Sequence, residues 1–182
     1  MLNWRPEDAE MYEDVQTRYY YQHSNLKKSP EKRLHKLWRS SRDSARTPVQ
    51  WTGGENAGFT TGTPWFYINE NYKDINVERE ESDPGSLLNF YREAISLRKG
   101  SHAVRHGSYK EYFKGSSKLY VYERESSEEK LLVVASFSEK PTKMRVPKSF
   151  DISSAEIILA SHKENTSSVL KPYESRVYRI KK

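Results

Sequence analysis

Short stretches of alternating apolar and polar residues fill the second half of the chain. This period of two predicts six strands, at residues 108–114, 118–124, 130–138, 143–146, 155–161 and 169–180. Short strands joined by polar turns are typical of an antiparallel β-sandwich, so we expect residues 102–182 to form one. Along Leu131–Ala135 the alternation gives way to a continuous apolar run, which predicts a central strand buried on both faces.

The first half of the chain shows helical spacing instead. We expect a helix at about residues 6–22, because Pro6 and the acidic residues after it favour a helix N-terminus. A second helix is expected at 30–38 and a third at 84–99, where Gly100 ends the pattern. The apolar stripe of the third helix must either be covered by other elements or stay exposed.

A long polar loop, residues 41–65, lies between the second and third helices. It is rich in glycine, and it places Arg42, Asp43 and Arg46 shortly before Trp51. Long structureless loops in compact domains are usually functional or disordered, and the aromatic residues argue against disorder. The loop is therefore expected to face a ligand. The alternative is a surface loop that merely packs its own Trp and Phe residues.

Three sequence blocks follow one another in this region: SRDSARTPVQW at 41–51, GENAGFTTGTPW at 54–65 and NYKDINVE at 71–78. Together they resemble the α-amylase-type glycoside hydrolases of family 13. Within that family they are most similar to the group of oligo-1,6-glucosidases, dextran glucosidases and trehalose-6-phosphate hydrolases. Two positions depart from the family pattern: Thr52 stands where many relatives have an acid, and Ser44 replaces the more usual Asn.

The resemblance implies an enzyme of more than twice this length, in which a (β/α)₈ barrel carries the chemistry and a small β-domain follows it. A closed barrel takes eight strands and roughly 250 residues, so this chain is expected to hold only the end of one. We therefore expect an α+β fold. Residues 1–101 would be a helical and loop remnant of the barrel, and residues 102–182 the antiparallel β-sandwich.

Catalytic carboxylates are not expected in this chain. Retaining glycoside hydrolysis needs two carboxyl groups about 5–5.5 Å apart, one as nucleophile and one as general acid and base. In the family these acids follow earlier barrel strands, and the sequence has no counterpart of them. Asp43 and Glu55 are the only acids of the loop. We expect no catalytic residue, no cofactor and no glycosidase activity from the chain alone.

Substrate binding is the role that the resemblance implies for the loop. In the family, an arginine of this run hydrogen-bonds the hydroxyls of the non-reducing glucose, so Arg46 is our first candidate here, with Arg42 second. A guanidinium suits this task because its five donors form a rigid planar fork. Asp43 would orient an arginine, or it would only hold the loop by a salt bridge. Trp51 would offer a stacking face for a sugar ring, although packing within the loop is the favoured interpretation.

Composition narrows the class of protein further. Only 35% of residues are apolar and the mean hydropathy is −0.97, which leaves little material for a core. The absence of cysteine excludes disulfides and thiolate metal sites, and it fits a cytoplasmic protein. No apolar run approaches the roughly 20 residues of a membrane span, and no charged-then-apolar leader opens the sequence.

A net charge of +6 raises the question of nucleic acid, because basic residues cluster between His23 and Arg42. No recognised nucleic-acid motif accompanies the cluster, and its spacing predicts an amphipathic helix with a solvated basic face. We therefore expect no nucleic-acid partner. His102 and His106 are a close pair without a nearby acid, and we expect no metal site there.

Three classes of function remain open. The chain is the carboxyl-terminal part of an intracellular α-glucosidase, a stand-alone carbohydrate-binding or regulatory module, or a basic protein that binds nucleic acid. We favour the first. Within it, short α-1,6-glucosides are our first choice of substrate and trehalose 6-phosphate the second, since relatives sharing this loop act on both.

Overall fold

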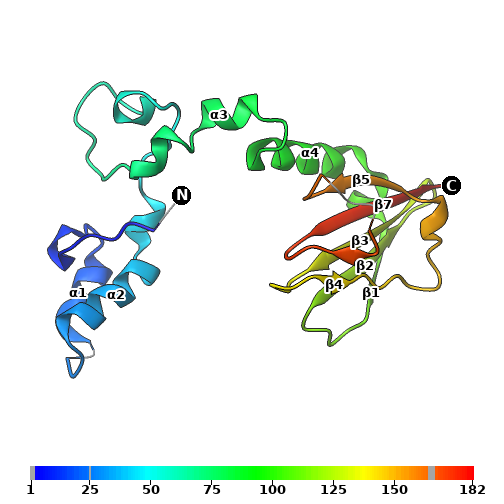
Figure 1. Cartoon of the computed structure of the whole chain (residues 1–182), viewed down its shortest axis with the longest axis horizontal. Coiled ribbons are helices and arrows are strands. Elements are labelled where there is room, and N and C mark those ends of the chain that lie inside the picture. The colour runs from blue at the N-terminus through cyan, green and yellow to red at the C-terminus, as the bar shows by residue number, and fades with distance from the viewer. Residues whose placement is uncertain (1–2, 25, 164–166) are drawn as a thin grey trace. The chain divides into compact units, whose positions relative to one another are not determined.

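The computed structural model describes residues 3–24, 26–163 and 167–182 (Figure 1). The chain forms two compact units, one ending at Asp83 and the other beginning at Pro84. Each unit has its own hydrophobic core, so each is described by itself. In the described part of the chain, no helix is long and apolar enough to cross a membrane.

Short helices joined by loops make up the first unit. They are η1 (Ala9–Met11), α1 (Val15–His23), α2 (Pro30–Ser40), η2 (Arg42–Ala45), η3 (Glu55–Gly58), η4 (Glu70–Lys73) and α3 (Val77–Ser82), where η marks a 3₁₀-helix. An aromatic cluster forms the core. Trp4 meets Tyr12 and Phe66 edge-on, with ring centroids 5.3 and 5.4 Å away, and Leu37 of α2 is buried beside them.

The first helix is shorter than its sequence predicts. α2 begins at Pro30 as expected, but the helix expected at 6–22 is replaced by η1 and α1. The amide N–H groups of Glu13 and Asp14 donate to the side chain of Asp43, at 2.8 and 3.0 Å, instead of entering a helix. A carboxylate from a distant segment therefore interrupts the helical pattern, and α1 starts only at Val15.

The second unit places two helices before an antiparallel sheet. Its elements are α4 (Leu87–Gly100), α5 (His102–His106), β1 (Ser108–Tyr112), β2 (Leu119–Glu125), β3 (Glu129–Ser136), β4 (Thr142–Lys143), η5 (Ile152–Ser154), β5 (Glu156–Ala160), β6 (Val169–Leu170) and β7 (Ser175–Lys181). The large sheet has the order β1-β2-β3-β7-β5, and β4 pairs with β6 in a separate ladder.

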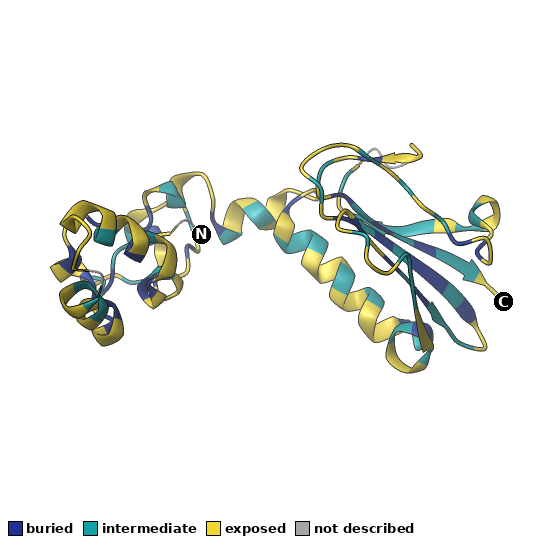
Figure 2. Ribbon diagram, turned by 90° about the horizontal axis from the view of Figure 1, so that it is seen from below, coloured by how far each residue is buried: buried dark blue, intermediate teal, exposed yellow. Residues whose placement is uncertain are grey.

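The apolar run at Leu131–Ala135 lies in β3, the central strand, as predicted. Leu132 and Val134 belong to the core on one face of the sheet. Leu131 and Val133 line a cavity of about 280 Å³ on the other face, opposite Ala94 and Leu97 of α4. Figure 2 shows α4 running along this sheet. Both faces of β3 are therefore covered, which explains why its alternation is lost.

The strand expected at 169–180 is divided in two. Tyr173 has a positive φ of 56°, and the Glu174 carboxylate accepts the Lys171 N–H at 2.7 Å. This turn separates β6 from β7 and lets β6 pair with β4, while Leu170 enters the core of the large sheet. The β-domain is thus a five-stranded antiparallel sheet with a two-residue ladder beside it, a smaller second layer than a full sandwich.

One stripe of α4 remains exposed within this unit. The helix begins at Leu87 because Ser86 is its N-cap and accepts the Asn89 N–H at 3.1 Å. Leu87, Tyr91 and Ile95 repeat every four residues and are 66%, 59% and 48% exposed. The apolar stripe expected for this helix therefore shows both outcomes. Ala94 lines the cavity against the sheet, whereas Leu87, Tyr91 and Ile95 stay exposed, and Figure 2 shows exposed segments of the helix in yellow.

A buried ion pair holds the turn before β7. Arg176 and Glu174 are 1% and 0% exposed, and the Arg176 Nε donates to Glu174 Oε1 at 2.6 Å. The Arg176 Nη1 also donates to the Ser167 carbonyl at 2.6 Å. Burial raises the pKa of the Glu174 carboxyl, but the hydrogen bonds from Arg176 and the Lys171 amide lower it more, so its pKa lies below the usual range.

Replacing Arg176 by Met should destabilise the second unit by about 3–5 kcal/mol, because it leaves the Glu174 carboxylate buried without its partner. Arg179→Met is the matched control on the same strand, since Arg179 pairs with the half-exposed Glu156 and should cost about 1 kcal/mol or less. Native-state hydrogen exchange of the β3 and β7 amides measures both. An equal loss of free energy of unfolding in the two variants would contradict the structural role of Arg176.

Candidate substrate-binding site

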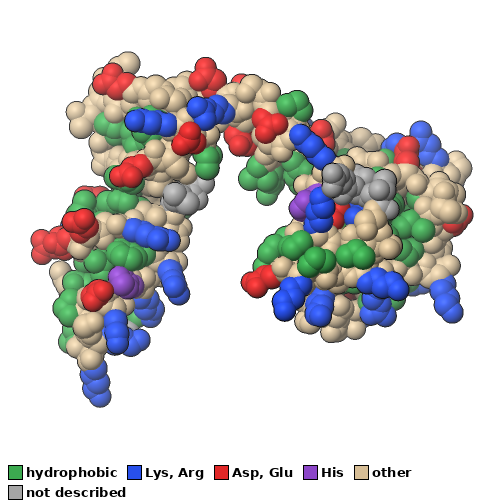
Figure 3. Space-filling view, viewed as in Figure 1, with side chains coloured by type: hydrophobic (Ala, Val, Ile, Leu, Met, Phe, Trp, Pro, Cys, Tyr) green, Lys and Arg blue, Asp and Glu red, His purple; other side chains and the backbone are tan. Residues whose placement is uncertain are grey.

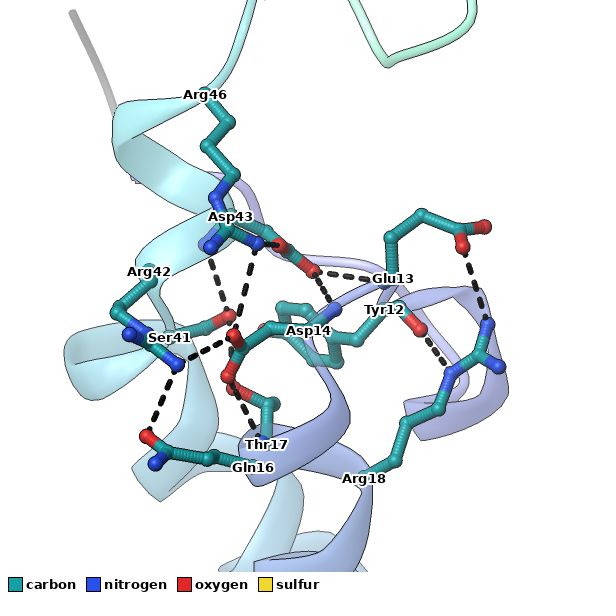
Figure 4. A network of polar contacts seen from close by, with 10 residues as sticks. All are labelled: Tyr12, Glu13, Asp14, Gln16, Thr17, Arg18, Ser41, Arg42, Asp43 and Arg46. Carbon is teal, nitrogen blue, oxygen red and sulfur yellow. Dashed lines mark hydrogen bonds and ion pairs between the residues drawn. The ribbon is translucent and has the colours of Figure 1, made fainter.

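The turn that follows α2 arranges the charged residues of the RDSAR segment. The Ser41 hydroxyl accepts the Asp43 N–H at 3.2 Å and so opens η2. Arg46 ends η2, and its N–H donates to the Asp43 carbonyl at 3.0 Å. This single turn brings the side chains of Arg42 and Arg46 toward the start of α1 (Figure 4).

Asp43 is the buried centre of this arrangement. It is 0% exposed, and its Oδ2 accepts the amide N–H groups of Glu13 and Asp14. Its Oδ1 accepts Nη1 of Arg46 at 3.2 Å. One carboxylate thus fixes the backbone before α1 with one oxygen and an arginine with the other.

Asp14 is a second buried carboxylate, 4% exposed, and it is the N-cap of α1. Its Oδ2 accepts the Thr17 N–H at 2.9 Å and the Thr17 hydroxyl at 2.8 Å. Its Oδ1 faces both arginines, at 3.0 Å from Arg42 Nη2 and 3.5 Å from Arg46 Nη1. Figure 4 shows the two guanidinium groups converging on this carboxylate.

Both arginines keep part of their donor set accessible. The Arg42 and Arg46 side chains are 58% and 42% exposed, although the carboxylates they bind are buried. Arg42 Nη2 also donates to the Gln16 side-chain oxygen at 3.0 Å. A guanidinium has five N–H donors, so each group retains donors that can reach a ligand hydroxyl. The arrangement is suited to binding, because the buried carboxylates orient the arginines while the exposed part of each guanidinium stays accessible.

The electrostatics of the network follow from these contacts. Burial raises the pKa of the Asp14 carboxyl, but the Thr17 hydrogen bonds and the charges of Arg42 and Arg46 lower it more, so the pKa lies below its usual range. Burial and the nearby Asp43 charge raise the pKa of Tyr12 to about 12. Asp14 and Asp43 balance the two arginines, so the formal charge of the network is zero.

The structure groups most, but not all, of the residues singled out from the sequence. Arg42, Asp43 and Arg46 lie together, and the pairing of Asp43 with an arginine is observed. Trp51 is 48% exposed, and in the described part of the chain no hydrogen bond or ring contact joins its indole to this network. Asp14 was missed, because its sequence position falls inside the helix expected at 6–22. The preference for Asp at a helix N-cap is the signal that points to it.

Backbone geometry holds the glycine-rich part of the loop. Asn56, Ala57 and Gly58 have φ values of 50°, 56° and 66°, a left-handed run that is unusual for non-glycine residues. The Asn56 side chain spans the turn by donating to the Thr60 and Gly62 carbonyls at 3.2 and 3.1 Å. The loop therefore has one defined shape.

Of the two departures from the family pattern, Thr52 lies beside this turn, whereas Ser44 lies in η2. The Thr52 hydroxyl accepts the Gly54 N–H at 3.2 Å, so Thr52 supports the turn. The Ser44 hydroxyl is buried, and it finds no hydrogen-bond partner among the described residues.

The second and third sequence blocks pack against the first. Val77 N–H donates to the Gln50 carbonyl at 2.9 Å and Glu78 N–H to the Trp51 carbonyl at 3.0 Å. These bonds tie the start of α3 to the segment that follows Arg46. The motif that runs along 41–78 is thus one structural assembly.

Comparison with known proteins assigns the chain to a family. The alpha-amylase catalytic-domain model matches residues 7–107 of the chain. The chain belongs to the alpha-amylase family. A probable oligo-1,6-glucosidase of Bacillus subtilis (strain 168) is 39% identical over 178 residues, which are 95% of this chain and 32% of that relative. The trehalose-6-phosphate hydrolase of the same organism is 35% identical, over 100% of the chain and 34% of the relative.

The fold of this alpha-amylase family chain is also similar to that of a solved relative. The crystal structure of Bacillus licheniformis trehalose-6-phosphate hydrolase matches with a TM-score of 0.89 and 37% identity, covering 100% of this chain and 34% of that one. The chain therefore spans about a third of the length of the relatives that it matches. Its helices and antiparallel sheet are the end of the catalytic barrel and a β-domain.

Asp43→Asn should destabilise the first unit by about 2–3 kcal/mol, because the amide cannot accept the backbone and arginine hydrogen bonds as a buried carboxylate does. All four tryptophans lie in this unit, so denaturant unfolding followed by tryptophan fluorescence reports on it alone. Asp74→Asn is the control, since Asp74 is exposed and pairs with the exposed Arg79. A loss no larger than that of the control would disprove the role of Asp43.

The lowered pKa of Asp14 predicts a loss of stability in acid. A carboxyl whose folded pKa is lower than its unfolded value of about 3.9 stabilises the fold above that pH, and the contribution disappears as the pH falls through the folded pKa. Titration of the Asp14 carboxyl by carbon-13 NMR measures the shift. Arg42→Gln and Arg46→Gln should each raise the pKa toward its usual value. An unshifted carboxyl in the unaltered chain would contradict the ion pairs.

Proposed function

We propose that this chain is the carboxyl-terminal part of a retaining α-glucosidase, in which Arg46 donates hydrogen bonds to the hydroxyls of the terminal glucose. The observation that carries the proposal is the orientation of the Arg46 guanidinium, fixed by two buried carboxylates yet 42% exposed. Arg42 is the second candidate, in the same network. The β-domain supports the barrel, with the barrel remnant proposed at 1–101 and the β-domain at 102–182.

No acid in the candidate site is suited to catalysis. A retaining hydrolase needs one carboxylate free to attack and one that exchanges a proton. Asp14 and Asp43 are occupied by backbone amides and arginines. We therefore propose that the catalytic carboxylates lie in the part of the family's catalytic domain that this chain does not span, and that the chain alone hydrolyses no glycoside.

The charge balance of the network favours a neutral ligand. Two buried carboxylates compensate the two arginines, so the group offers hydrogen-bond donors without a net positive charge that would attract a phosphate. Short α-1,6-glucosides are therefore the first proposed substrate, and trehalose 6-phosphate the second. Relatives named for each activity are 39% and 35% identical to the chain. A cytoplasmic location is part of this proposal.

Two other functions receive less support. A stand-alone carbohydrate-binding or regulatory module would bind sugar without a barrel, and among the described residues we find no binding surface beyond the arginine loop that favours it. Nucleic-acid binding would use the basic cluster between His23 and Arg42, most of which lies in α2. Figure 3 shows acidic and hydrophobic side chains interspersed with Lys and Arg over this region, and the Lys36 ammonium lies over the Tyr20 ring, 4.5 Å from its centroid.

A chimera tests the proposed function, in which this chain replaces the matching third of a curated oligo-1,6-glucosidase. Arg46→Ala in the chimera should reduce kcat/KM by about 2–4 kcal/mol of transition-state stabilisation, because a charged donor is lost from a closed site. Kinetics with isomaltose measure it. Near-normal turnover would refute the assignment, and a loss in Arg42→Ala alone would move it to that residue.

The isolated chain supplies the comparison. It should show no chemical-shift change with isomaltose and no salt-sensitive binding of a short DNA duplex. Sugar-induced shifts in the isolated chain would support the stand-alone module instead, and duplex binding the nucleic-acid function.

A further inference from the structure

A single oxygen of Asp14 serves both arginines of the candidate site. Oδ1 lies 3.0 Å from Arg42 Nη2 and 3.5 Å from Arg46 Nη1. Of the two arginines, Asp43 contacts Arg46, and its second oxygen accepts the amides of Glu13 and Asp14. Asp14 is therefore the one acid in this network that links the two guanidinium groups.

The Asp14 carboxylate has little freedom to turn. Two hydrogen bonds from Thr17, at 2.9 and 2.8 Å, hold Oδ2 against the first turn of α1. With Oδ2 fixed, the direction of Oδ1 is fixed as well. The side chain is only 5% exposed, so water screens its charge weakly. Through Asp14, the first turn of α1 therefore determines where the two guanidinium groups lie.

Arg42 and Arg46 need such a partner because they carry like charges and both lie within 3.5 Å of the same carboxylate oxygen. Like charges held this close repel each other, and long flexible side chains lose entropy when they are held in place. A shared carboxylate offsets the repulsion and restricts both rotamers before a ligand arrives. Restricting a binding group in advance lowers the cost of binding.

We propose that Asp14 is a positioning residue for sugar recognition, which orients Arg46 and Arg42 without itself touching the substrate. This inference rests on the proposed function, in which the two arginines contact glucose hydroxyls. The competing interpretation is that Asp14 only caps α1. The two interpretations differ in whether the charge of Asp14 matters once the cap is preserved.

Asp14→Asn separates charge from capping, because Asn is as good an N-cap as Asp. Asp8→Asn is the matched control. Asp8 also caps a helix of the same unit, accepting the Glu10 N–H at 2.9 Å, and it forms no ion pair among the described residues. In the isolated chain, the side-chain N–H protons of Arg42 and Arg46 should exchange with water about tenfold faster in Asp14→Asn and unchanged in Asp8→Asn. Equal exchange in the two variants would overturn the proposal.

The same substitutions in the chimera test the effect on recognition. Asp14→Asn should lower kcat/KM for isomaltose roughly tenfold, and it should lower it much less when Arg46 is already Ala, since Asp14 acts through the arginine. Full additivity of the two losses would show that Asp14 is only structural. A chimera in which Arg46→Ala retains full activity would instead refute the proposed function, and would leave the exchange result in the isolated chain standing.

Discussion

The first unit depends on the burial of one carboxylate, that of Asp43. A buried charge is tolerated only when hydrogen bonds replace the lost water, and here the Glu13 and Asp14 amides and the Arg46 guanidinium provide them. Because these amides are directed at Asp43, they cannot continue a helix from residue 9, and α1 starts afterwards with Asp14 as its cap. One interaction thus sets a helix boundary and places the second acid beside the arginines.

Elements that depend on local pattern were predictable from the sequence. β2 and β3 lie within about two residues of their expected positions, and the loss of alternation in β3 correctly marked the central strand. The boundaries that differed depend on distant or unusual contacts. The break before α1 is caused by a side chain about thirty residues later, and the break before β7 by a left-handed Tyr173. The periodicity of the sequence reveals neither the contact with Asp43 nor the left-handed backbone at Tyr173.

The candidate site shows the same division. The RDSAR run identified Arg42, Asp43 and Arg46 as a group, since one turn of helix brings them together. It gave no direction for their side chains, because the residue that orients them, Asp14, belongs to another segment. The substrate-binding roles expected for the arginines rest on the resemblance to a family. The structure adds the buried carboxylates that pair with them. Trp51 shows the limit of reading a motif as a site, since it lies in the run but outside the network.

Both units contain a buried carboxylate paired with an arginine, but the arginine is exposed in the first unit and buried in the second. In each, a buried carboxylate binds backbone N–H with one oxygen and an arginine with the other: Asp43 accepts two amides and Arg46, and Glu174 accepts one amide and Arg176. Arg176 is 1% exposed and also donates to the Ser167 carbonyl, so its donors are used within the fold. The Arg46 side chain is 42% exposed and keeps donors available. In a chain with only 35% apolar residues, such polar anchors supplement a small core. Under the proposed function, the exposure of the guanidinium separates Arg46, which would bind substrate, from Arg176, which only stabilises the fold.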